Sequence, residues 1–541
     1  MKFMSKLAFV PLAVCFLVLS VYAVPSMNLT AESIEELADP IGIMSLSEIA
    51  DMAGDYYLLT DITAGEDFVS IGTEEEPFTG TFNGKGYTVT DLPCPLFYVT
   101  KGATIQDVSV TNASFNSGEV FGAVVAKATD NTFLWKCSFS GSITLDNSGI
   151  STVFGGIVGI CDKDSSILNC NSNVTVSYTG NAYLASLGGI VGENRGTVKG
   201  CISEGSLVAV SDKYKVNLGG IAGENTGKIE ECFSHMTLEG KASSEASGVF
   251  AGGIAGFNNG GSITNSSSTG SITAHGKTVY PSYSGGIAGL NINGSISVAK
   301  STSELSTVHS FTGGITGYSI GHKGTANIND VLYMSQMTLV DSVSGGITAT
   351  ALKTDEDNST CCIAYALNLS SAKAVGYTNA QATEIYSMGE TDGISAQKSG
   401  DLLKENGISE LENHAPFWVG NTEVSAFPDL LIPKNSVEAS IIVSNIGDNG
   451  DIAYYLYNPT SSECAKAFTA VYYNGSQYIG MDYVENISSE NYARLKATDV
   501  PEGTTRIKFI AFAKTFDIGF VPARVDSVQI QYTYTEGSNE T

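Results

Sequence analysis

The sequence predicts an all-β protein, with a parallel β-solenoid (β-helix) followed by an immunoglobulin-like β-sandwich. Three observations lead to this fold class. A glycine pair recurs about every 32 residues, which indicates a repeat array. Each unit contains short segments of alternating polar and apolar residues without an amphipathic helical stretch. The glycine pairs stop before residue 350, and from about residue 435 six or seven strand-like segments follow in ~100 residues.

The first 23 residues are typical of a secretory signal peptide. Lys2 and Lys6 precede the run LAFVPLAVCFLVLSVYA, and Val21 and Ala23 occupy the −3 and −1 positions of a cleavage site. A lipoprotein acceptor role for Cys15 is the less favoured alternative, because Cys15 lies in the middle of the apolar run. No later apolar segment approaches the ~20 residues that a membrane span needs. We therefore expect a secreted or cell-surface protein that is not inserted in a membrane after cleavage, with residues 24–44 as a linker.

A short helix is expected where the array begins. Ser45 and Glu48 have the spacing of a capping box at the start of the segment SLSEIADMA. A helix there would cover the open edge of the first coil, which solenoids must protect from pairing with other chains. We assign the β-helix with this N-terminal helix cap to residues 45–375.

The repeat has a measurable period. From the second glycine of each pair, the steps are 33, 31, 33, 33, 28 and 32 residues. Helical repeats of similar length are excluded by the strand-like alternation, and propeller blades need four strands in ~40 or more residues. A solenoid remains, with one coil per unit and equivalent strands stacked in parallel at ~4.8 Å. The pairs lie at 155–156, 188–189, 219–220, 252–253, 285–286, 313–314 and 345–346.

Three kinds of residue recur within the unit, and each predicts a mechanical role. The segment GGI[AV]G is interpreted as a strand whose small residues allow close approach, with Ile221 and its equivalents pointing inward. An asparagine ladder is expected at left-handed corners, because Asn tolerates that conformation and stacked amides can bond to one another. A column of small buried residues completes the unit. The ladder is Asn194, Asn225, Asn258 and Asn291, and the column is Cys137, Cys170, Cys201, Cys232, Ser266 and Ala299.

The segments GGIVGENRG and GGIAGENTG resemble the GLUG motif of secreted bacterial surface proteins. The motif also occurs beside the catalytic domain of immunoglobulin A-cleaving metallopeptidases. The entry segment DYYLLTDIT and the exit segment HAPFWVGNTEVSAFPDLL are similar to the ends of such arrays, so the resemblance covers about residues 45–432. It implies a right-handed β-helix on an adhesin-like or stalk-like protein. The last units depart from the motif, where YSIG and ATAL replace the asparagine turn.

The C-terminal part changes character. Residues 376–434 are assigned to a closing segment of the β-helix, and residues 435–541 to the β-sandwich domain. Asn474-Gly475 is a hairpin turn sequence between two of the predicted strands. A second noncatalytic hypothesis is that the array is a spacer that displays the sandwich, and that the ligand binds to the aromatic strands of the sandwich, which carry Tyr454, Tyr455, Tyr472 and Tyr473.

Charge and cysteine content exclude several classes of function. The net charge is −28 with only four arginines, so nucleic-acid binding is set aside, because phosphate contacts need clustered Lys and Arg. Ten cysteines in 541 residues are too sparse for a disulfide scaffold. The sequence contains no CxxC pair, which excludes a zinc site of that spacing. A disulfide within the stacked cysteines stays open as the less favoured alternative, and Cys361-Cys362 has no assigned role.

Catalytic motifs are weak or absent. Five histidines occur without an HExxH motif, which argues against a metallopeptidase. Gly321-His322-Lys323 and Arg506-Ile507-Lys508 resemble parts of a polygalacturonase site, but no paired aspartates precede them. Glu193 and Glu224 could bind a cation such as calcium, although exposed turn positions are favoured. Glu224 and His235 are the unrepeated residues of their coil.

The predicted function is a noncatalytic, adhesin-like protein whose β-helix is a binding face or stalk for an extracellular protein or glycan. A carbohydrate-active enzyme, either a polysaccharide lyase or a glycoside hydrolase, is the alternative. We nominate no catalytic, cofactor-binding or metal-binding residue, and no cofactor is expected.

Overall fold

The computed structural model describes residues 40–115, 119–147, 151–368 and 370–387, together with ten strands between 396 and 531. The predicted signal peptide and most of the predicted linker lie outside the described residues. The contacts divide the chain into two units, Met1–Asp39 and Pro40–Thr541. Within the described residues no helix is long and apolar enough to cross a membrane.

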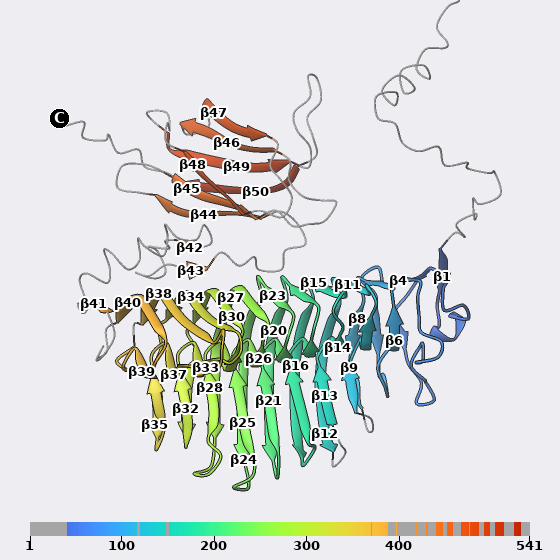
Figure 1. Ribbon diagram of the computed structural model, residues 1–541. Helices are drawn as coiled ribbons and strands as arrows, with labels where there is room; N and C mark the ends of the chain where they lie inside the picture. Colours follow the sequence, from blue (N-terminus) through green and yellow to red (C-terminus); the bar gives the residue numbers. More distant parts are fainter. Residues whose placement is uncertain are drawn as a thin grey trace, which may run out of the picture. The chain divides into compact units, whose positions relative to one another are not determined.

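The described part of the array is a parallel β-solenoid, as the sequence predicts (Figure 1). The coils between Val120 and Asn368 each contribute strands to three sheets, which we call sheets A, B and C, and in all these sheets have 23, ten and eight strands. Strands one coil apart pair in parallel, so equivalent residues stack in columns along the axis. Leu218 of one coil, for example, pairs with Ala251 of the next.

The strands of sheets B and C alternate along the chain. Sheet C consists of β9 (Val120–Gly122), β13 (Ser151–Gly155), β17 (Leu184–Gly188), β21 (Lys215–Gly219), β25 (Gly248–Gly252), β28 (Ser282–Gly285), β32 (Ser310–Gly313) and β36 (Val343–Gly345). Sheet B consists of β6 (Phe97–Lys101), β10 (Val125–Thr129), β14 (Val158–Cys161), β18 (Val191–Asn194), β22 (Ala222–Asn225), β26 (Ala255–Asn259), β29 (Ala288–Ile292), β33 (Thr316–Gly321), β37 (Thr348–Lys353) and β39 (Val375–Thr378).

Sheet A closes each coil with short strands, long strands or both. Its short members are β1 (Ile41–Ile43), β2 (Tyr56–Leu58), β3 (Ile62–Thr63), β4 (Thr81–Asn83), β5 (Thr88–Thr90), β7 (Thr104–Gln106), β8 (Ser109–Thr111), β11 (Phe133–Trp135), β15 (Ser166–Leu168), β19 (Thr197–Lys199) and β23 (Lys228–Glu230). The others are β12 (Ser138–Asn147), β16 (Asn171–Gly180), β20 (Ile202–Ser211), β24 (Phe233–Ala242), β27 (Ser262–His275), β30 (Ser295–Ser301), β31 (Glu304–Val308), β34 (Thr325–Tyr333), β35 (Met337–Val340), β38 (Thr360–Asn368), β40 (Gln381–Ser387) and β41 (Ala396–Gln397).

The interior is a continuous column of aliphatic side chains. Ile190, Ile221, Ile254 and Ile287 are fully buried, one per coil, as the prediction of inward-pointing isoleucines requires. The glycine pair, however, does not lie within one strand. Gly219 ends β21, and Gly220 and Ile221 form the bend before β22. The pair is therefore the corner between sheets C and B.

The asparagine ladder is confirmed, but not at left-handed corners. Asn194 donates to Asn225 at 2.7 Å, and Asn225 donates to Asn258 at 2.8 Å. Asn258 continues the ladder to Asn291 at 2.8 Å, and all four side chains are buried inside sheet B. None of the four has a positive φ. The ladder thus satisfies buried polar groups within strands, since a buried amide requires hydrogen-bonding partners.

The left-handed corner lies elsewhere, in sheet A. It separates two strands in the coils of β11 to β24, and it lies within a single strand in β27, β30, β34 and β38. One residue per coil has a φ near +50°, directly before the small buried column. Many residue types occupy this corner, from glycine to β-branched valine. They are Lys136, Asn169, Gly200, Glu231, Asn265, Val298, Asp330 and Tyr365.

Val298→Gly is expected to stabilise the solenoid by about 1 kcal/mol. Valine at Val298 has a φ of 51°, a conformation that costs a β-branched residue roughly 1–2 kcal/mol, whereas glycine adopts it freely. Urea unfolding of the two proteins measures the difference. The reciprocal change at the same corner, Gly200→Val, is expected to lower the midpoint. A lower midpoint for Val298→Gly would show that the packing of the valine outweighs its backbone cost.

The first coil begins with a strand rather than a helix. β1 lies at the end of the predicted linker, residues 24–44, and pairs in parallel with β2. The predicted cap is a single 3-10 turn, η1 (Leu46–Glu48). Ser45 accepts from the backbone of Ser47, and the Glu48 carboxylate accepts from the backbone of Met44. Ser45 caps the turn, but Glu48 bonds to Met44 and not to Ser45, so the predicted capping box does not close. The turn is also too short to form a helix over the coil edge.

The C-terminal strands form two antiparallel sheets and one two-stranded ladder. β44 (Ser440–Ile446), β45 (Ile452–Tyr457) and β48 (Tyr492–Ala497) form one sheet. β47 (Gln477–Glu485), β46 (Ala467–Asn474), β49 (Arg506–Phe512) and β50 (Arg524–Gln531) form the other. β42 (Trp418–Val419) pairs with β43 (Asp429–Leu430) in the predicted closing segment. The immunoglobulin-like sandwich stays a prediction.

Candidate functional site

The candidate site is a groove where the outer faces of sheets B and C meet. The two sheets bend sharply at the glycine pair, and the third glycine of GGIAG allows them to approach. A Cβ on Gly223 would lie 2.5 Å from the backbone nitrogen of Leu187 in the previous coil. Glycine is needed here because any side chain would separate sheet B of one coil from sheet C of its neighbour.

Two columns of outward-facing residues line this groove. On sheet C the register places Ser186, Asn217, Phe250, Tyr283 and Phe311 in one column. On sheet B it places Glu193, Glu224, Phe257, Leu290 and Tyr318 in the other. Both columns therefore change from polar to apolar between the same two coils.

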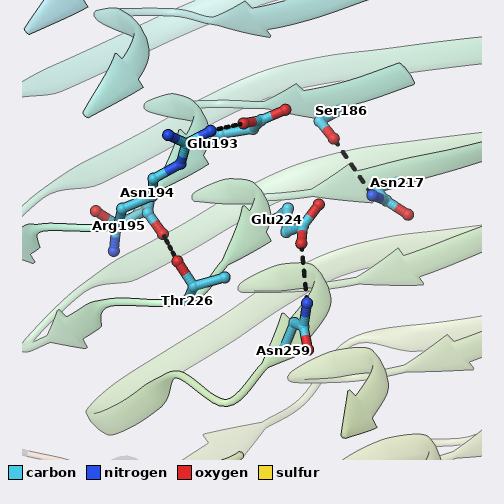
Figure 2. Close-up of polar contacts among 8 residues, drawn as sticks. All are labelled: Ser186, Glu193, Asn194, Arg195, Asn217, Glu224, Thr226 and Asn259. Carbon is cyan, nitrogen blue, oxygen red and sulfur yellow. Dashed lines mark hydrogen bonds and ion pairs between the residues drawn. The ribbon is translucent and has the colours of Figure 1, made fainter. Parts of the chain in front are cut away.

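The polar part of the groove is shown in Figure 2. Asn217 donates to Ser186 at 3.3 Å along the sheet C column. Arg195 forms an ion pair with Glu193 at 3.1 Å, and Asn259 donates to Glu224 at 3.3 Å. Glu193 and Glu224 are half-buried strand residues, so their assignment to exposed turns is wrong. Among the described residues no group of three or more His, Cys, Asp or Glu could hold a metal ion.

The apolar part is a cluster of aromatic rings that contact one another. Phe250 and Tyr283 have ring centroids 5.1 Å apart, and Tyr283 lies 5.3 Å from Tyr318 across the groove. Phe311 continues the contact at 5.6 Å from Tyr283. These rings lie outside the main core of the solenoid. They form a second, external apolar cluster of the kind that ligands contact.

A cavity of about 520 Å³ opens beside these rings. Gly248 leaves part of this space open, because it has no side chain where Leu184 and Lys215, in the same column, have one. A Cβ on Gly248 would meet only the Pro281 carbonyl oxygen, at 3.8 Å. The volume lies in the range of small-ligand sites. The lining residues are Tyr183, Leu184, Tyr214, Lys215, Asn217, Glu224, Ala246, Ser247, Gly248, Phe250, Phe257, Tyr280, Pro281, Tyr283, Leu290 and Ile292.

Connecting loops place tyrosines at the mouth of the cavity. Tyr183 and Tyr280 are 70% and 52% exposed, which is unusual for large aromatic side chains. Tyr183 packs edge-on against Tyr214 with centroids 5.1 Å apart. Exposed rings around an apolar cavity are a frequent feature of binding surfaces.

Glu224 is the acidic group of the cavity. Burial raises the pKa of its carboxyl above the ordinary value of 4.5, and the neighbouring Glu193 carboxylate acts in the same direction. The hydrogen bond from Asn259 and the charge of Arg195 oppose this shift. At neutral pH the folded protein therefore holds a charge that its surroundings compensate poorly.

Glu224→Gln is expected to raise the thermal midpoint at neutral pH. Because the folded-state pKa is raised, the ionised carboxyl destabilises the fold above that pKa. This penalty falls as the pH drops through the folded-state pKa and is gone below 4.5. Melting curves from neutral pH down to about 4.5 should show a gain that shrinks to nothing. Glu239→Gln, on an exposed strand position, controls for the loss of one charge. A gain that persists at acid pH would contradict the assignment.

The stacked cysteines are small interior residues, as the favoured prediction has it. Cys137, Cys170, Cys201 and Cys232 are free and buried. The Cys232 thiol donates to the Glu230 carbonyl at 3.2 Å, and in the next coil the Ser266 hydroxyl donates to Thr264 at 2.9 Å. The thiol and the hydroxyl thus donate the same hydrogen bond, to the carbonyl two residues earlier. Burial raises the pKa of Cys170 and Cys232, which leaves these thiols protonated and unreactive.

The other residues named from the sequence are not brought together. His235 is exposed on β24, where its Nδ1 lies 2.6 Å from the Thr269 hydroxyl, so the Glu-Cys-His sequence forms no cluster. His322 is exposed beside Thr354 in a late coil. Arg506 and Lys508 belong to β49 of an antiparallel sheet. These positions give no support to a polygalacturonase-like site.

The Cys361-Cys362 pair and the C-terminal tyrosines are not brought together as sites either. Cys361 is buried on β38, whereas Cys362 faces the other side, with its thiol 3.8 Å from the Gln381 side chain. Tyr472 is buried, so it cannot contact a ligand as the sandwich hypothesis supposed. Tyr454 and Tyr455 lie on β45.

Sequence reasoning missed the aromatic groove, although a signal for it was present. The sheet C column lies two residues before the first glycine of each pair, and the sheet B column lies four after the second. Phe250 and Phe257 flank Gly252 and Gly253 in this way. Because the residue type changes along each column, the positions did not stand out as a repeat.

Comparison with known proteins gives limited similarity. No protein-family model matches the chain. A zinc metalloprotease, ZmpC of Streptococcus pneumoniae, is 33% identical over 115 residues, which are 20% of this chain. The chain spans only 6% of that relative's length.

Two solved structures share 16% sequence identity with the chain. An IgA1 protease matches 47% of this chain and 20% of its own, with a TM-score of 0.33. A candidate immunoglobulin A1 protease of Bacteroides ovatus matches 73% and 93%, with a TM-score of 0.32. The GLUG motif stays a prediction.

Proposed function

We propose that the chain is an extracellular, noncatalytic binding protein whose solenoid holds its ligand in the aromatic groove. The observation that carries this proposal is the cavity of about 520 Å³ between sheets B and C, with exposed tyrosines at its mouth. The parallel ladder fixes the positions of the wall rings Phe250, Phe257 and Tyr283, so little conformational entropy is lost there when a ligand binds. The predicted signal peptide and the resemblance to secreted surface proteins support an extracellular location.

The similarity to metalloproteases is consistent with a binding region rather than a protease domain. The zinc metalloprotease of S. pneumoniae is similar to this chain over a short segment only, and the present sequence contains no HExxH motif. We propose that the solenoid is a region that such proteins carry for contact with partners. Attachment to a cell surface as an adhesin is part of the same proposal.

One observation favours an enzyme as the second candidate. Glu193 and Glu224 are neighbours on the sheet B ladder, and the pKa of Glu224 is raised, as in pairs of carboxyls that cleave glycosidic bonds. Against this, Glu193 is paired with Arg195 and does not line the cavity. We therefore keep glycoside cleavage as the alternative, to be tested with Glu193→Gln and Glu224→Gln.

Arrays of glycans and extracellular matrix proteins, probed with the full secreted chain, test the proposal. Gly248→Leu is the informative variant, because the backbone tolerates a side chain there and leucine would occupy the cavity. Gly65→Leu, at a site where an added Cβ meets nothing within 4 Å, is the matched control. We expect every specific array signal to fall at least about tenfold in Gly248→Leu and to persist in Gly65→Leu. Signals that Gly248→Leu leaves unchanged, or release of reducing sugar from a polysaccharide, would overturn the proposal.

A further inference from the structure

The wall of the cavity contains a carboxylate without a cationic partner. Glu224 accepts one hydrogen bond, from Asn259, and Arg195 is engaged by Glu193. Within the described part of the chain no Lys, Arg or His nitrogen forms an ion pair with Glu224. A half-buried carboxylate gains most from a cation that arrives with the ligand, because the cation offsets the cost of its burial.

Aromatic rings line the same cavity as this carboxylate. Phe257 follows Glu224 in the sheet B column, and Phe250 follows Asn217 in the sheet C column. Their centroids are 6.1 Å apart with the rings nearly perpendicular, and Tyr214 and Tyr283 complete the same wall. Aromatic faces combined with a carboxylate bind ammonium and guanidinium groups, because the ring quadrupole and the charge both attract a cation.

The protein's own lysines already use these faces. The Lys215 ammonium lies 5.3 Å from the Phe250 centroid, and the Lys213 ammonium lies 5.0 Å from that of Tyr214. Both lysines are exposed, so each ammonium can leave its ring for solvent. Lys215 therefore marks a place for a ligand cation and competes for it.

We propose that the groove recognises a lysine or arginine side chain of a basic polypeptide, with Glu224 as its counter-ion and Phe250 and Phe257 as its aromatic contacts. This inference rests on the proposed function. The net charge of −28 supports it, since a strongly acidic surface attracts basic partners over long range. A neutral glycan would stack on the same rings without needing the Glu224 charge, and an anionic glycan would need Lys215.

Single-residue probes separate these ligands with the full chain at low ionic strength and neutral pH. We use Nα-acetyl-arginine methylamide and Nα-acetyl-lysine methylamide, with Nα-acetyl-norleucine methylamide as the uncharged control and methyl glucoside as the sugar. Titration calorimetry or ligand-observed NMR gives each affinity. We expect the charged probes to bind at least about tenfold more tightly than norleucine.

Three variants locate the site. Glu224→Gln should remove the preference for charged probes, whereas Glu239→Gln, an exposed carboxylate on β24, should leave it unchanged. Lys215→Met should strengthen the binding of the charged probes, because it removes the competing ammonium. Weaker binding of the charged probes in Lys215→Met would show that the Lys215 ammonium does not compete for their place and would overturn the inference.

Equal binding of norleucine, a preference that survives Glu224→Gln, binding of the glucoside alone, or no binding of any probe would each overturn the inference. The array experiment with Gly248→Leu then shows which proposal has failed. If Gly248→Leu still abolishes the array signals, the groove is a binding site for another ligand and only the cation preference is wrong. If Gly248→Leu changes nothing, the binding function of the groove fails as well.

Discussion

Replacement of Gly219 by valine is expected to unfold the solenoid or to prevent its accumulation, at a cost above about 4 kcal/mol. An added Cβ would overlap the carbonyl oxygen of Ala222 and would lie 2.9 Å from the backbone nitrogen of Gly256 in the next coil. Both obstacles are backbone atoms, so no side-chain movement relieves the clash. Circular dichroism and urea unfolding of the purified protein measure the effect.

Gly248→Val is the matched control for this change. Gly248 also lies on sheet C, one coil further along, but its Cβ would enter the cavity rather than the backbone. We expect wild-type stability to within about 1 kcal/mol, since few interactions are altered. Equal unfolding midpoints for Gly219→Val and Gly248→Val would show that the bend between sheets C and B is not as tight as the structure has it.

Asn225→Leu is expected to destabilise the solenoid by about 2–5 kcal/mol. It removes two buried amide hydrogen bonds, one from Asn194 and one to Asn258, and leaves the Asn258 oxygen without its ladder donor. Leucine matches asparagine in size but offers no polar group. Chemical denaturation measures the loss.

Asn173→Leu, at an exposed position on β16, controls for the change of residue type and should have little effect. The ladder also predicts a graded result at its end. Asn291 donates to the Ser319 hydroxyl at 3.0 Å, so the structure itself accepts serine as a ladder member. Asn291→Ser should therefore cost less than Asn225→Leu, and an equal cost would contradict the ladder as the source of stability.

The parts of the fold that the sequence predicts are those where one residue type repeats at one position. The coil, the inward isoleucines and the asparagine ladder are of this kind. Each position faces the closed interior, where every coil imposes the same packing and hydrogen-bonding demands. Asn194 and Asn225 have the same partners one coil apart, so selection of the same residue follows from the same environment.

The left-handed corner could not be predicted in this way. Its conformation is shared, but Lys136, Glu231 and Val298 are chemically different. The parallel pairing of sheet A on either side of the corner imposes this conformation. The local preference of asparagine for positive φ therefore does not predict which residue occupies the corner. The expectation that Asn225 occupies a left-handed corner applied a local rule where the tertiary contacts decide.

The candidate site was difficult to predict for a related reason. Side chains on the outer face of the solenoid are not packed in the interior, so the residue type in an outward-facing column is free to change from coil to coil. The change from Glu224 to Phe257 was visible in the sequence, but it was interpreted as the mark of a solvated turn. Only the angle between sheets B and C shows that the two positions face a groove. That angle depends on the bend at the glycine pair, whose effect on the path of the chain is not readable from composition.

The register between coils has an evolutionary consequence. Since every coil meets its neighbours through the same columns, duplication or loss of one complete unit would join cleanly to the coils above and below. Each added unit would lengthen the groove by one strand spacing, ~4.8 Å, and supply one new pair of facing positions. Recombination between units could therefore change the length and chemistry of the groove without any redesign of the interior.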